Sequence, residues 1–176
     1  METQVLSDSI KVPSASDGVG SVDASQRHPK IALNVKRLAH FKGDLPKYET
    51  SGASGFDVRA QLQTALSLAP GERVLAPTGL SFEVPHGYEL QARARSGLAF
   101  KKGLGLVNAP GTIDADYRGE VKIILVNFSK DVVIIEDQER IAQLVLCPVV
   151  QAEFSEIKEL SETQRGAGGF GSTGTL

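Results

Sequence analysis

The chain has 176 residues, of which 41% are hydrophobic, and its net charge is −2. This length is enough for one domain with a sizeable core, and the near-neutral charge gives no indication of a nucleic-acid-binding surface. No apolar run is long enough to span a membrane. The single cysteine, Cys147, lies in an apolar run and cannot form an internal disulfide, so we expect a buried thiol and a cytoplasmic protein.

The first half of the chain consists of a polar leader followed by short alternating runs. Residues 1–29 are rich in Ser, Asp and Gly, a composition that predicts disorder. From residue 30 on, we expect one β domain that extends to residue 162. Apolar and polar residues alternate in its short runs, which predict strands separated by Pro/Gly turns. These runs lie at residues 31–35, 55–60, 66–68, 74–76, 80–84 and 88–94.

The second half contains one expected helix and further β-rich runs. Residues 96–102 predict a short helix with Ser96 as a possible N-cap and Gly103 as its stop. The β-rich runs lie at residues 104–110, 121–127, 132–135 and 140–147. In residues 152–162 an apolar residue recurs at every third position, which favours a helix without excluding an extended segment. Residues 163–176 are too glycine-rich to fold alone and predict a flexible arm.

Many short strands with Pro/Gly turns and almost no helix predict an all-β fold of the sandwich, jelly-roll or barrel type. The histidines His28, His40 and His86 are scattered and lack metal-ligand spacing. We therefore expect no zinc site.

A charged stretch at residues 111–120 lies between the apolar runs 104–110 and 121–127. The pattern predicts a β-hairpin with a charged turn. Asp114 and Asp116 are two residues apart, so both carboxylates would point to one side of an extended segment. Such carboxylates can bind a hydroxyl, accept a proton from water or lie near a metal. A solvated turn is the alternative interpretation.

Two other stretches have the composition of phosphate sites. Arg95, Ser96 and Gly97 lie at the expected helix start, where free backbone N–H groups attract anions. Taken alone, this stretch is also explained by an ordinary helix start beside a surface arginine. The tail at residues 165–174 combines Arg165 with glycines and hydroxyls, and its Phe170 could stack on a base. A frayed C-terminus is the alternative there.

Together these stretches resemble the trimeric dUTPase family over residues 31–174. Five family motifs appear in order, and the order and spacing are highly specific although each motif alone is weak. They are Ala53-Ser54-Gly55-Phe56-Asp57; Arg95-Ser96-Gly97; residues 111–120 with Asn108 upstream; residues 140–144; and residues 165–174. The leader 1–29 has no counterpart in the shared family core.

The resemblance implies a jelly-roll-like β fold and a homotrimer whose active sites are shared between subunits. It also implies hydrolysis of dUTP to dUMP and pyrophosphate with Mg²⁺ as cofactor. This reaction keeps uracil out of DNA and supplies dUMP for dTMP synthesis. Attack of water on the α-phosphorus requires a base, and it requires donors where negative charge grows.

The resemblance also implies roles for individual residues. Asp114 matches the carboxylate that orients the attacking water and holds the 3′-hydroxyl, and Asp57 matches the residue that holds Mg²⁺ through water. Tyr117 matches the ring that leaves no room for a 2′-hydroxyl. The other implied substrate contacts are Asn108, Gly111, Thr112 and Ile113 at the uracil edge; Arg95, Ser96, Gly97 and Gln143 at the phosphates; Lys122; and Arg165, Phe170, Gly171, Ser172 and Thr173 in the arm.

Two other functions remain open from the sequence. A dCTP deaminase shares this fold but needs a different polar pocket for the cytosine amine. A trimeric binding protein that has lost catalysis and regulates a partner is the second alternative. The presence of Asp114, Ser96, Arg165 and Phe170 argues against such a loss.

Overall fold

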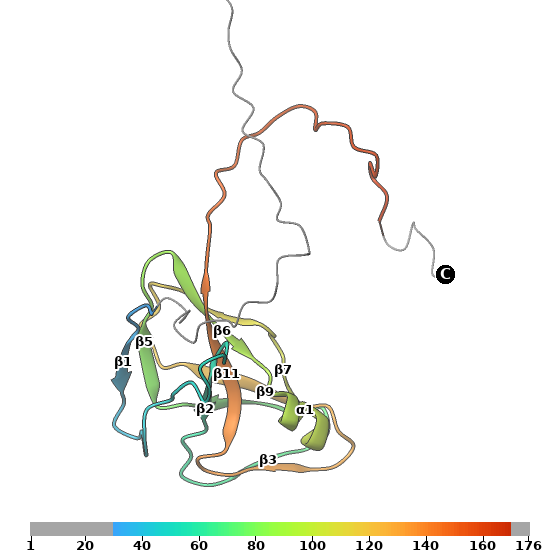
Figure 1. The fold of residues 1–176 in the computed structure, drawn as a ribbon. Coiled ribbons are helices and arrows are strands. Elements are labelled where there is room, and N and C mark those ends of the chain that lie inside the picture. Colours follow the sequence, from blue (N-terminus) through green and yellow to red (C-terminus); the bar gives the residue numbers. More distant parts are fainter. Residues whose placement is uncertain (1–29, 170–176) are drawn as a thin grey trace, which may run out of the picture.

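The structure is a computed structural model that describes residues 30–169. Antiparallel strands make up nearly all of its helices and strands (Figure 1). The expected leader 1–29 lies outside the described residues, as do Phe170, Gly171, Ser172 and Thr173 of the expected arm. The elements are β1 (Asn34–Arg37), β2 (Phe56–Arg59), β3 (Leu66–Leu68), β4 (Arg73–Pro77), β5 (Leu80–Glu83), β6 (Tyr88–Arg93), α1 (Ser96–Lys102), β7 (Leu104–Leu106), β8 (Gly111–Ile113), β9 (Lys122–Asn127), β10 (Val133–Ile135) and β11 (Arg140–Pro148).

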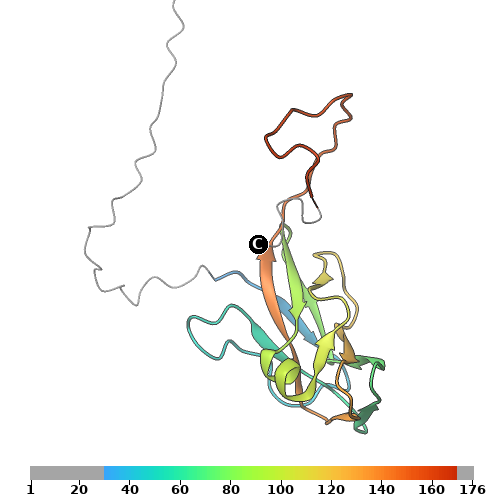
Figure 2. The same cartoon turned by 90° about the vertical axis from the view of Figure 1, so that its right-hand side faces the viewer.

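The strands form two larger sheets and two pairs. The larger sheets have the strand orders β2-β11-β6-β8 and β4-β9-β7, and the pairs are β1-β5 and β10-β3. Every pairing is antiparallel. Figure 2 shows β6 and β11 side by side, with the chain after β11 running away from the body. The expected all-β class is confirmed.

One hydrophobic core lies between the two larger sheets. Alternate residues of β11 point into it, so Leu144 is fully buried whereas Gln143 is half-buried. Leu90 of β6 packs in the same cluster as Ile123 and Leu125 of β9. Burial of each such side chain stabilises the fold by about 1.5–3 kcal/mol. The period-2 pattern of the strands therefore decides which side chains are left to face outward.

The predicted short helix is confirmed as α1, but its predicted N-cap is wrong. Ser96 is already helical, and the N-cap is Arg95, whose backbone is extended and whose side chain makes no cap bond. Gly103 ends the helix as expected, with φ at 65° and its N–H directed to the carbonyl of Ala99. A Cβ at Gly103 would also lie 2.8 Å from the Cβ of Ser129, so glycine is required there for two reasons.

The predicted charged hairpin is confirmed only in part. β7 and β9 pair as its two strands, with Leu106 opposite Leu125. Residues Gly111–Ile113, however, belong to β8, which pairs with β6 in the other sheet. The chain from Asp114 is not extended, because the N–H of Tyr117 donates to the carbonyl of Asp114 at 3.2 Å and closes a turn. The predicted alternation of two aspartates along an extended segment is therefore wrong.

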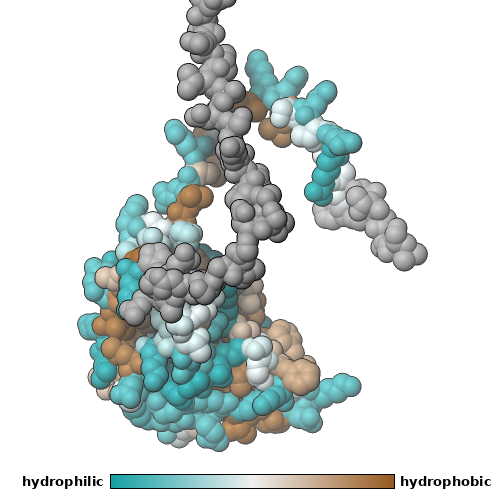
Figure 3. Space-filling view, viewed as in Figure 1, coloured by the Kyte–Doolittle hydropathy of each residue, from teal (hydrophilic) through white to brown (hydrophobic). Residues whose placement is uncertain are grey.

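The chain after β11 is exposed up to residue 167, and residues 152–162 form neither a helix nor a strand, so the helix that the spacing favoured is not formed. Phe154 is 95% exposed and Leu160 is 85% exposed. Short helices gain most of their stability from packing an apolar face, and nothing among the described residues covers this one. Figure 3 shows apolar side chains standing among polar ones along this segment. Within residues 30–169, no helix has the length and hydropathy needed to cross a membrane.

Candidate active site

The turn that follows β8 forms one wall of an open cavity of about 440 Å³, which we call the hairpin pocket. Five of the predicted substrate contacts line it: Thr112, Ile113, Asp114, Tyr117 and Lys122. The other lining residues are Leu75, Glu120, Val121 and Ile124. The structure thus gathers two carboxylates, one aromatic ring and one ammonium group around a cavity that is also lined by aliphatic side chains, a composition suited to a base attached to a sugar.

The ring of Tyr117 is held by its own turn. Its hydroxyl donates to the backbone carbonyl of Glu120 at 3.0 Å. A Cβ at Gly119 would lie 2.6 Å from Cζ of the ring, so the ring rests directly against the glycine backbone. The ring remains 45% exposed. It is therefore fixed along one edge and free to contact a ligand along the other.

Buried hydrogen bonds attach the end of the turn to the neighbouring strands. The hydroxyl of Thr78 donates to the carbonyl of Val121 at 2.6 Å, and the N–H of Val121 donates to the carbonyl of Leu80 at 2.8 Å. Thr78 and Val121 are both nearly inaccessible to solvent. Sequence reasoning missed Thr78, because a threonine between a proline and a glycine is an ordinary turn residue.

Asn108 lies against the start of β8. A Cβ at Gly111 would come within 2.9 Å of Nδ2 of Asn108, so only glycine allows the amide to approach the strand so closely. Asn108 is itself exposed. The amide and the backbone of β8 thus form one polar edge beside the hairpin pocket.

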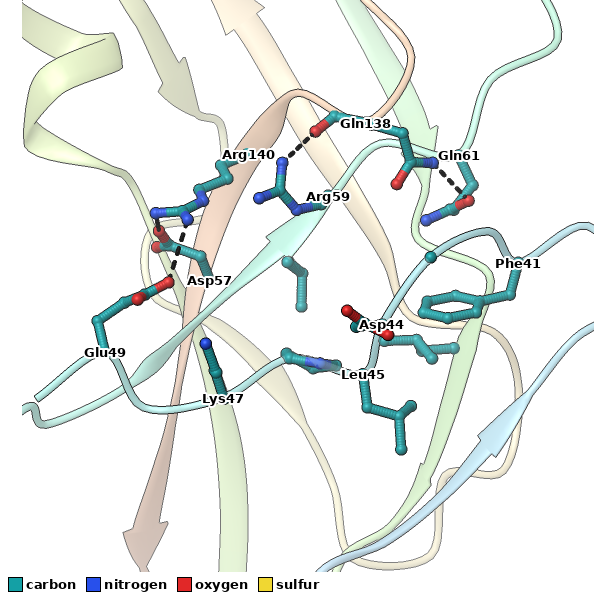
Figure 4. Close-up of a pocket in the computed structure, with 14 residues that line it drawn as sticks. Phe41, Asp44, Leu45, Lys47, Glu49, Asp57, Arg59, Gln61, Gln138 and Arg140 are labelled. Carbon is teal, nitrogen blue, oxygen red and sulfur yellow. Dashed lines mark hydrogen bonds and ion pairs between the residues drawn. The ribbon is translucent and has the colours of Figure 1, made fainter.

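A second group, the arginine cluster, joins the predicted site residues Asp57 and Arg95 to Arg140 of the fourth family motif and to Glu49, which the sequence analysis did not single out. The carboxylate of Asp57 is 3.1 Å from Nε of Arg95 and 3.4 Å from Nη1 of Arg140. Nη2 of Arg140 also pairs with Glu49 at 3.1 Å (Figure 4). Glu49, Asp57 and Arg140 of this cluster line a second open cavity, of about 420 Å³. Two guanidinium groups side by side are suited to binding phosphate groups.

Gln143 joins this cluster through the sheet register. It is opposite Asp57 of β2 on one side and opposite Arg93 of β6 on the other. Residues directly opposite one another in a sheet point to the same face, so Gln143 and Asp57 share the outward face. Gly55 permits this close packing, because a Cβ there would lie 2.8 Å from Cγ of Gln143.

The remaining predicted residues lie around these two groups. Ser96 and Gly97 are exposed in the first turn of α1, directly after Arg95. Arg165 lies in the exposed segment after β11, where its Nε donates to the carbonyl of Gly168 at 2.8 Å. It belongs to neither group.

The hairpin pocket and the arginine cluster lie far apart within one chain. Asp57 is on the first strand of the four-stranded sheet and Ile113 on the last, three strand spacings away. The register also places them three residues apart along the strands. With about 4.8 Å between strands and about 3.3 Å per residue, their separation is about 17 Å. One chain therefore does not enclose a small ligand with both groups.

A carboxylate outside both groups has a shifted pKa. A hydrogen bond from the ammonium group of Lys42 lowers the pKa of Asp137, and the backbone N–H of Leu62 adds to this effect. The distances are 2.8 Å to each donor. This pair attaches the loop after β1 to the turn before β11.

The described residues contain no group of three His, Cys, Asp or Glu side chains that could hold a metal ion. Both oxygens of Asp57 face guanidinium groups, and its side chain is 15% exposed. A carboxylate oxygen has lone pairs for a second donor, so Asp57 can still accept a water molecule. This fits Mg²⁺, which keeps several waters and takes its other ligands from phosphates.

Comparison with known proteins identifies the family. The dUTPase family model matches residues 42–174. The deoxyuridine 5'-triphosphate nucleotidohydrolase of Bdellovibrio bacteriovorus is 65% identical over 145 residues, which cover 82% of this chain and 97% of the relative. The chain belongs to the dUTPase family.

Further members of the dUTPase family agree with this result. The deoxyuridine 5'-triphosphate nucleotidohydrolase of Rhizobium rhizogenes is 57% identical, over 81% of this chain and 93% of the relative. The dUTPase of Staphylococcus bacteriophage 80alpha, solved with dUPNHPP, has a TM-score of 0.71 and 27% identity, over 83% of this chain and all of that one. The resemblance found in the sequence is confirmed, and the all-β architecture is the dUTPase fold.

Proposed function

We propose that this chain hydrolyses dUTP to dUMP and pyrophosphate. The observation that carries the proposal is the hairpin pocket, where a carboxylate and a tyrosine ring border a cavity that fits a nucleoside. The nucleotidohydrolase names of relatives with 56–65% identity support it. The reaction keeps uracil out of DNA and supplies dUMP for dTMP synthesis.

We assign the role of general base to Asp114. It is exposed at the start of the turn, on the wall of the hairpin pocket, where a water molecule and a sugar hydroxyl can both reach it. As a base it would take a proton from the water that attacks the α-phosphorus. Tyr117 would lie against C2′ of the sugar and leave no room for a 2′-hydroxyl.

The uracil edge is assigned to the backbone of β8 and to Asn108. Backbone donors and acceptors of Gly111, Thr112 and Ile113, together with the amide of Asn108, can pair with a pyrimidine edge. Lys122 borders the same cavity.

We assign the triphosphate to the arginine cluster and its surroundings. Arg95, Ser96, Gly97 and Gln143 supply donors on the outward face of the sheet and the first turn of α1. The arm would close over the bound nucleotide with Arg165, Phe170, Gly171, Ser172 and Thr173. Mg²⁺ held through water by Asp57 would offset the negative charge of the triphosphate.

A homotrimer with shared active sites would bring the two groups together. One chain separates them by about 17 Å, so a hairpin pocket facing the arginine cluster of another chain is required for both to touch one nucleotide. The exposed apolar side chains after β11, such as Phe154, support contact with another subunit. A cytoplasmic location is also proposed, and the free thiol of Cys147 supports a reducing compartment.

Incubation with dUTP and dCTP separately tests the reaction. Pyrophosphate from dUTP alone is the expected result. Ammonia from dCTP would identify a dCTP deaminase instead, and the absence of both products would favour a non-catalytic binding protein.

Mixed trimers test the shared site. One variant is truncated before Arg165 and the other carries Asp114→Asn, so each alone is expected to be nearly inactive. After joint refolding, some sites combine an intact Asp114 with an intact arm from a different chain, and activity returns. Differential tags establish that mixed trimers formed. Tagged mixed trimers without activity would contradict the shared site.

A further inference from the structure

Glu120 occupies an unusual position beside the hairpin pocket, because both its carboxylate and its backbone carbonyl are in use. Oε1 accepts the N–H of Gly79 at 2.8 Å and lies 2.8 Å from Nε2 of His40. Oε2 lies 3.6 Å from Nζ of Lys122. The backbone carbonyl of the same residue accepts the hydroxyl of Tyr117. The Glu120 side chain is only 13% exposed.

The partners of this carboxylate come from separate parts of the chain. His40 follows β1, Gly79 lies between β4 and β5, and Lys122 begins β9. The carboxylate therefore attaches the turn to two distant segments, at His40 and Gly79, while Lys122 adds a positive charge from two residues further along the chain. Thr78 makes a further attachment next to it, through the carbonyl of Val121.

Among the acidic side chains of residues 111–120, only Glu120 attaches the turn to the rest of the described chain through its carboxylate. Arg118 turns away from it, since Nη1 donates to the carbonyl of Ala115 and Nη2 lies 3.8 Å from Glu83. Asp114 and Asp116 are exposed. The charged groups that face the Glu120 carboxylate within the described chain are His40, when protonated, and Lys122.

We propose that Glu120 is a positioning residue that fixes the Tyr117 ring and thereby sets the discrimination between deoxyribose and ribose nucleotides. This rests on the proposed dUTP hydrolysis. The ring is half-exposed and has one hydrogen bond, so its position follows the carbonyl that accepts its hydroxyl. That carbonyl belongs to the peptide unit whose N–H donates to Leu80, and the carboxylate of the same residue adds attachments to Gly79 and His40. A ring that can move no longer excludes a 2′-hydroxyl.

The readout is the ratio of kcat/KM for dUTP to kcat/KM for UTP. Glu120→Ala removes all three side-chain contacts and is expected to lower this ratio about tenfold, the effect of one lost backbone hydrogen bond. Glu120→Gln keeps an oxygen for the N–H of Gly79 and is expected to retain most of the ratio. Tyr117→Phe removes the hydroxyl that ties the ring to Glu120 and is expected to lower the ratio as Glu120→Ala does.

A double-mutant cycle separates positioning from general destabilisation. Because Glu120 acts through the Tyr117 hydroxyl, the double variant is expected to lose no more discrimination than the larger single effect. Asp137→Ala is the matched control, since Asp137 also pairs with a cation and accepts a backbone N–H but lines neither the hairpin pocket nor the arginine cluster. It is expected to lower the melting temperature without changing the ratio.

Each outcome decides the question. An unchanged ratio in a folded Glu120→Ala enzyme that hydrolyses dUTP would overturn the inference, and so would fully additive effects in the cycle. If Glu120→Ala does not fold, an unchanged ratio in Tyr117→Phe is sufficient to overturn it. A wild-type chain that does not hydrolyse dUTP would instead refute the proposed function, and the inference with it.

Discussion

Substitution of Gly55 by alanine tests how closely the arginine cluster depends on packing between β2 and β11. The added Cβ would lie 2.5 Å from the carbonyl oxygen of Leu144 and 2.8 Å from Cγ2 of Val145. The carbonyl belongs to the backbone of β11, which is paired on both sides and cannot move aside as a flexible side chain can. The strands must therefore separate locally.

The expected magnitude follows from this overlap. Added methyl groups in closely packed sites cost about 1–3 kcal/mol. For a chain of this size, 1 kcal/mol lowers the melting temperature by about 2–4 °C, so Gly55→Ala is expected to lower it by about 2–12 °C. Because Asp57 and Gln143 lie on the two strands that separate, KM for dUTP is expected to rise more than kcat falls.

Thermal unfolding followed by circular dichroism, at one protein concentration for all variants, measures the first effect. Steady-state hydrolysis of dUTP measures the second. Gly52→Ala is the control, because a Cβ there meets no atom within 4 Å. A melting temperature of Gly55→Ala equal to that of Gly52→Ala would refute the packing argument.

Three further predictions concern single side chains. Asp114→Asn is expected to keep nucleotide binding while turnover falls about 10²–10⁴-fold, and near-normal turnover would remove Asp114 from the mechanism. Gly119→Ala places a methyl group against the hydroxyl end of the Tyr117 ring, which is free to move on its exposed side. The melting temperature should therefore change little. If the displaced ring costs about 1–3 kcal/mol of discrimination, the ratio of kcat/KM for dUTP to kcat/KM for UTP falls about 5- to 150-fold. An unchanged ratio would contradict the contact between Gly119 and the ring. Asp137→Asn should lower stability at pH 7, because the pKa of Asp137 is depressed by Lys42 below its ordinary value of 3.8. The stabilisation by the ionised Asp137 carboxylate is complete above pH 3.8 and is lost as the pH falls through the depressed pKa. The free energies of urea unfolding of the two proteins should therefore come closer together as the pH falls toward about 3. A difference that does not depend on pH would rule out this ion pair as its cause.

Local patterns in the sequence were sufficient for the strand content and for the family. The alternation in residues 80–84 and 88–94 corresponds to β5 and β6, and Gly103 ends α1 as expected. These features depend on neighbouring residues, since side-chain periodicity and glycine geometry act within a few positions. The family motifs are likewise read directly from residue order.

Long-range contacts decided what the local patterns left open. Residues 111–113 could be a turn or a strand by composition, and pairing with β6 made them β8. The apolar spacing of residues 152–162 suits a helix, but without a covering surface in the described chain the segment forms no helix.

For the candidate site too, the sequence determined one part and the tertiary structure decided another. Residue order alone identified Asp57, Asp114 and Tyr117 as chemistry-bearing residues. Strand pairing placed Asp57 on one edge strand of the four-stranded sheet and Asp114 directly after the other edge strand, and a contact across 80 positions joined His40 to Glu120. Such contacts depend on how distant segments pack, because two partners of the Glu120 carboxylate, His40 and Gly79, lie 80 and 41 positions away in the sequence. The chemical groups are therefore determined by the sequence itself, whereas their grouping and orientation are decided only by the tertiary structure.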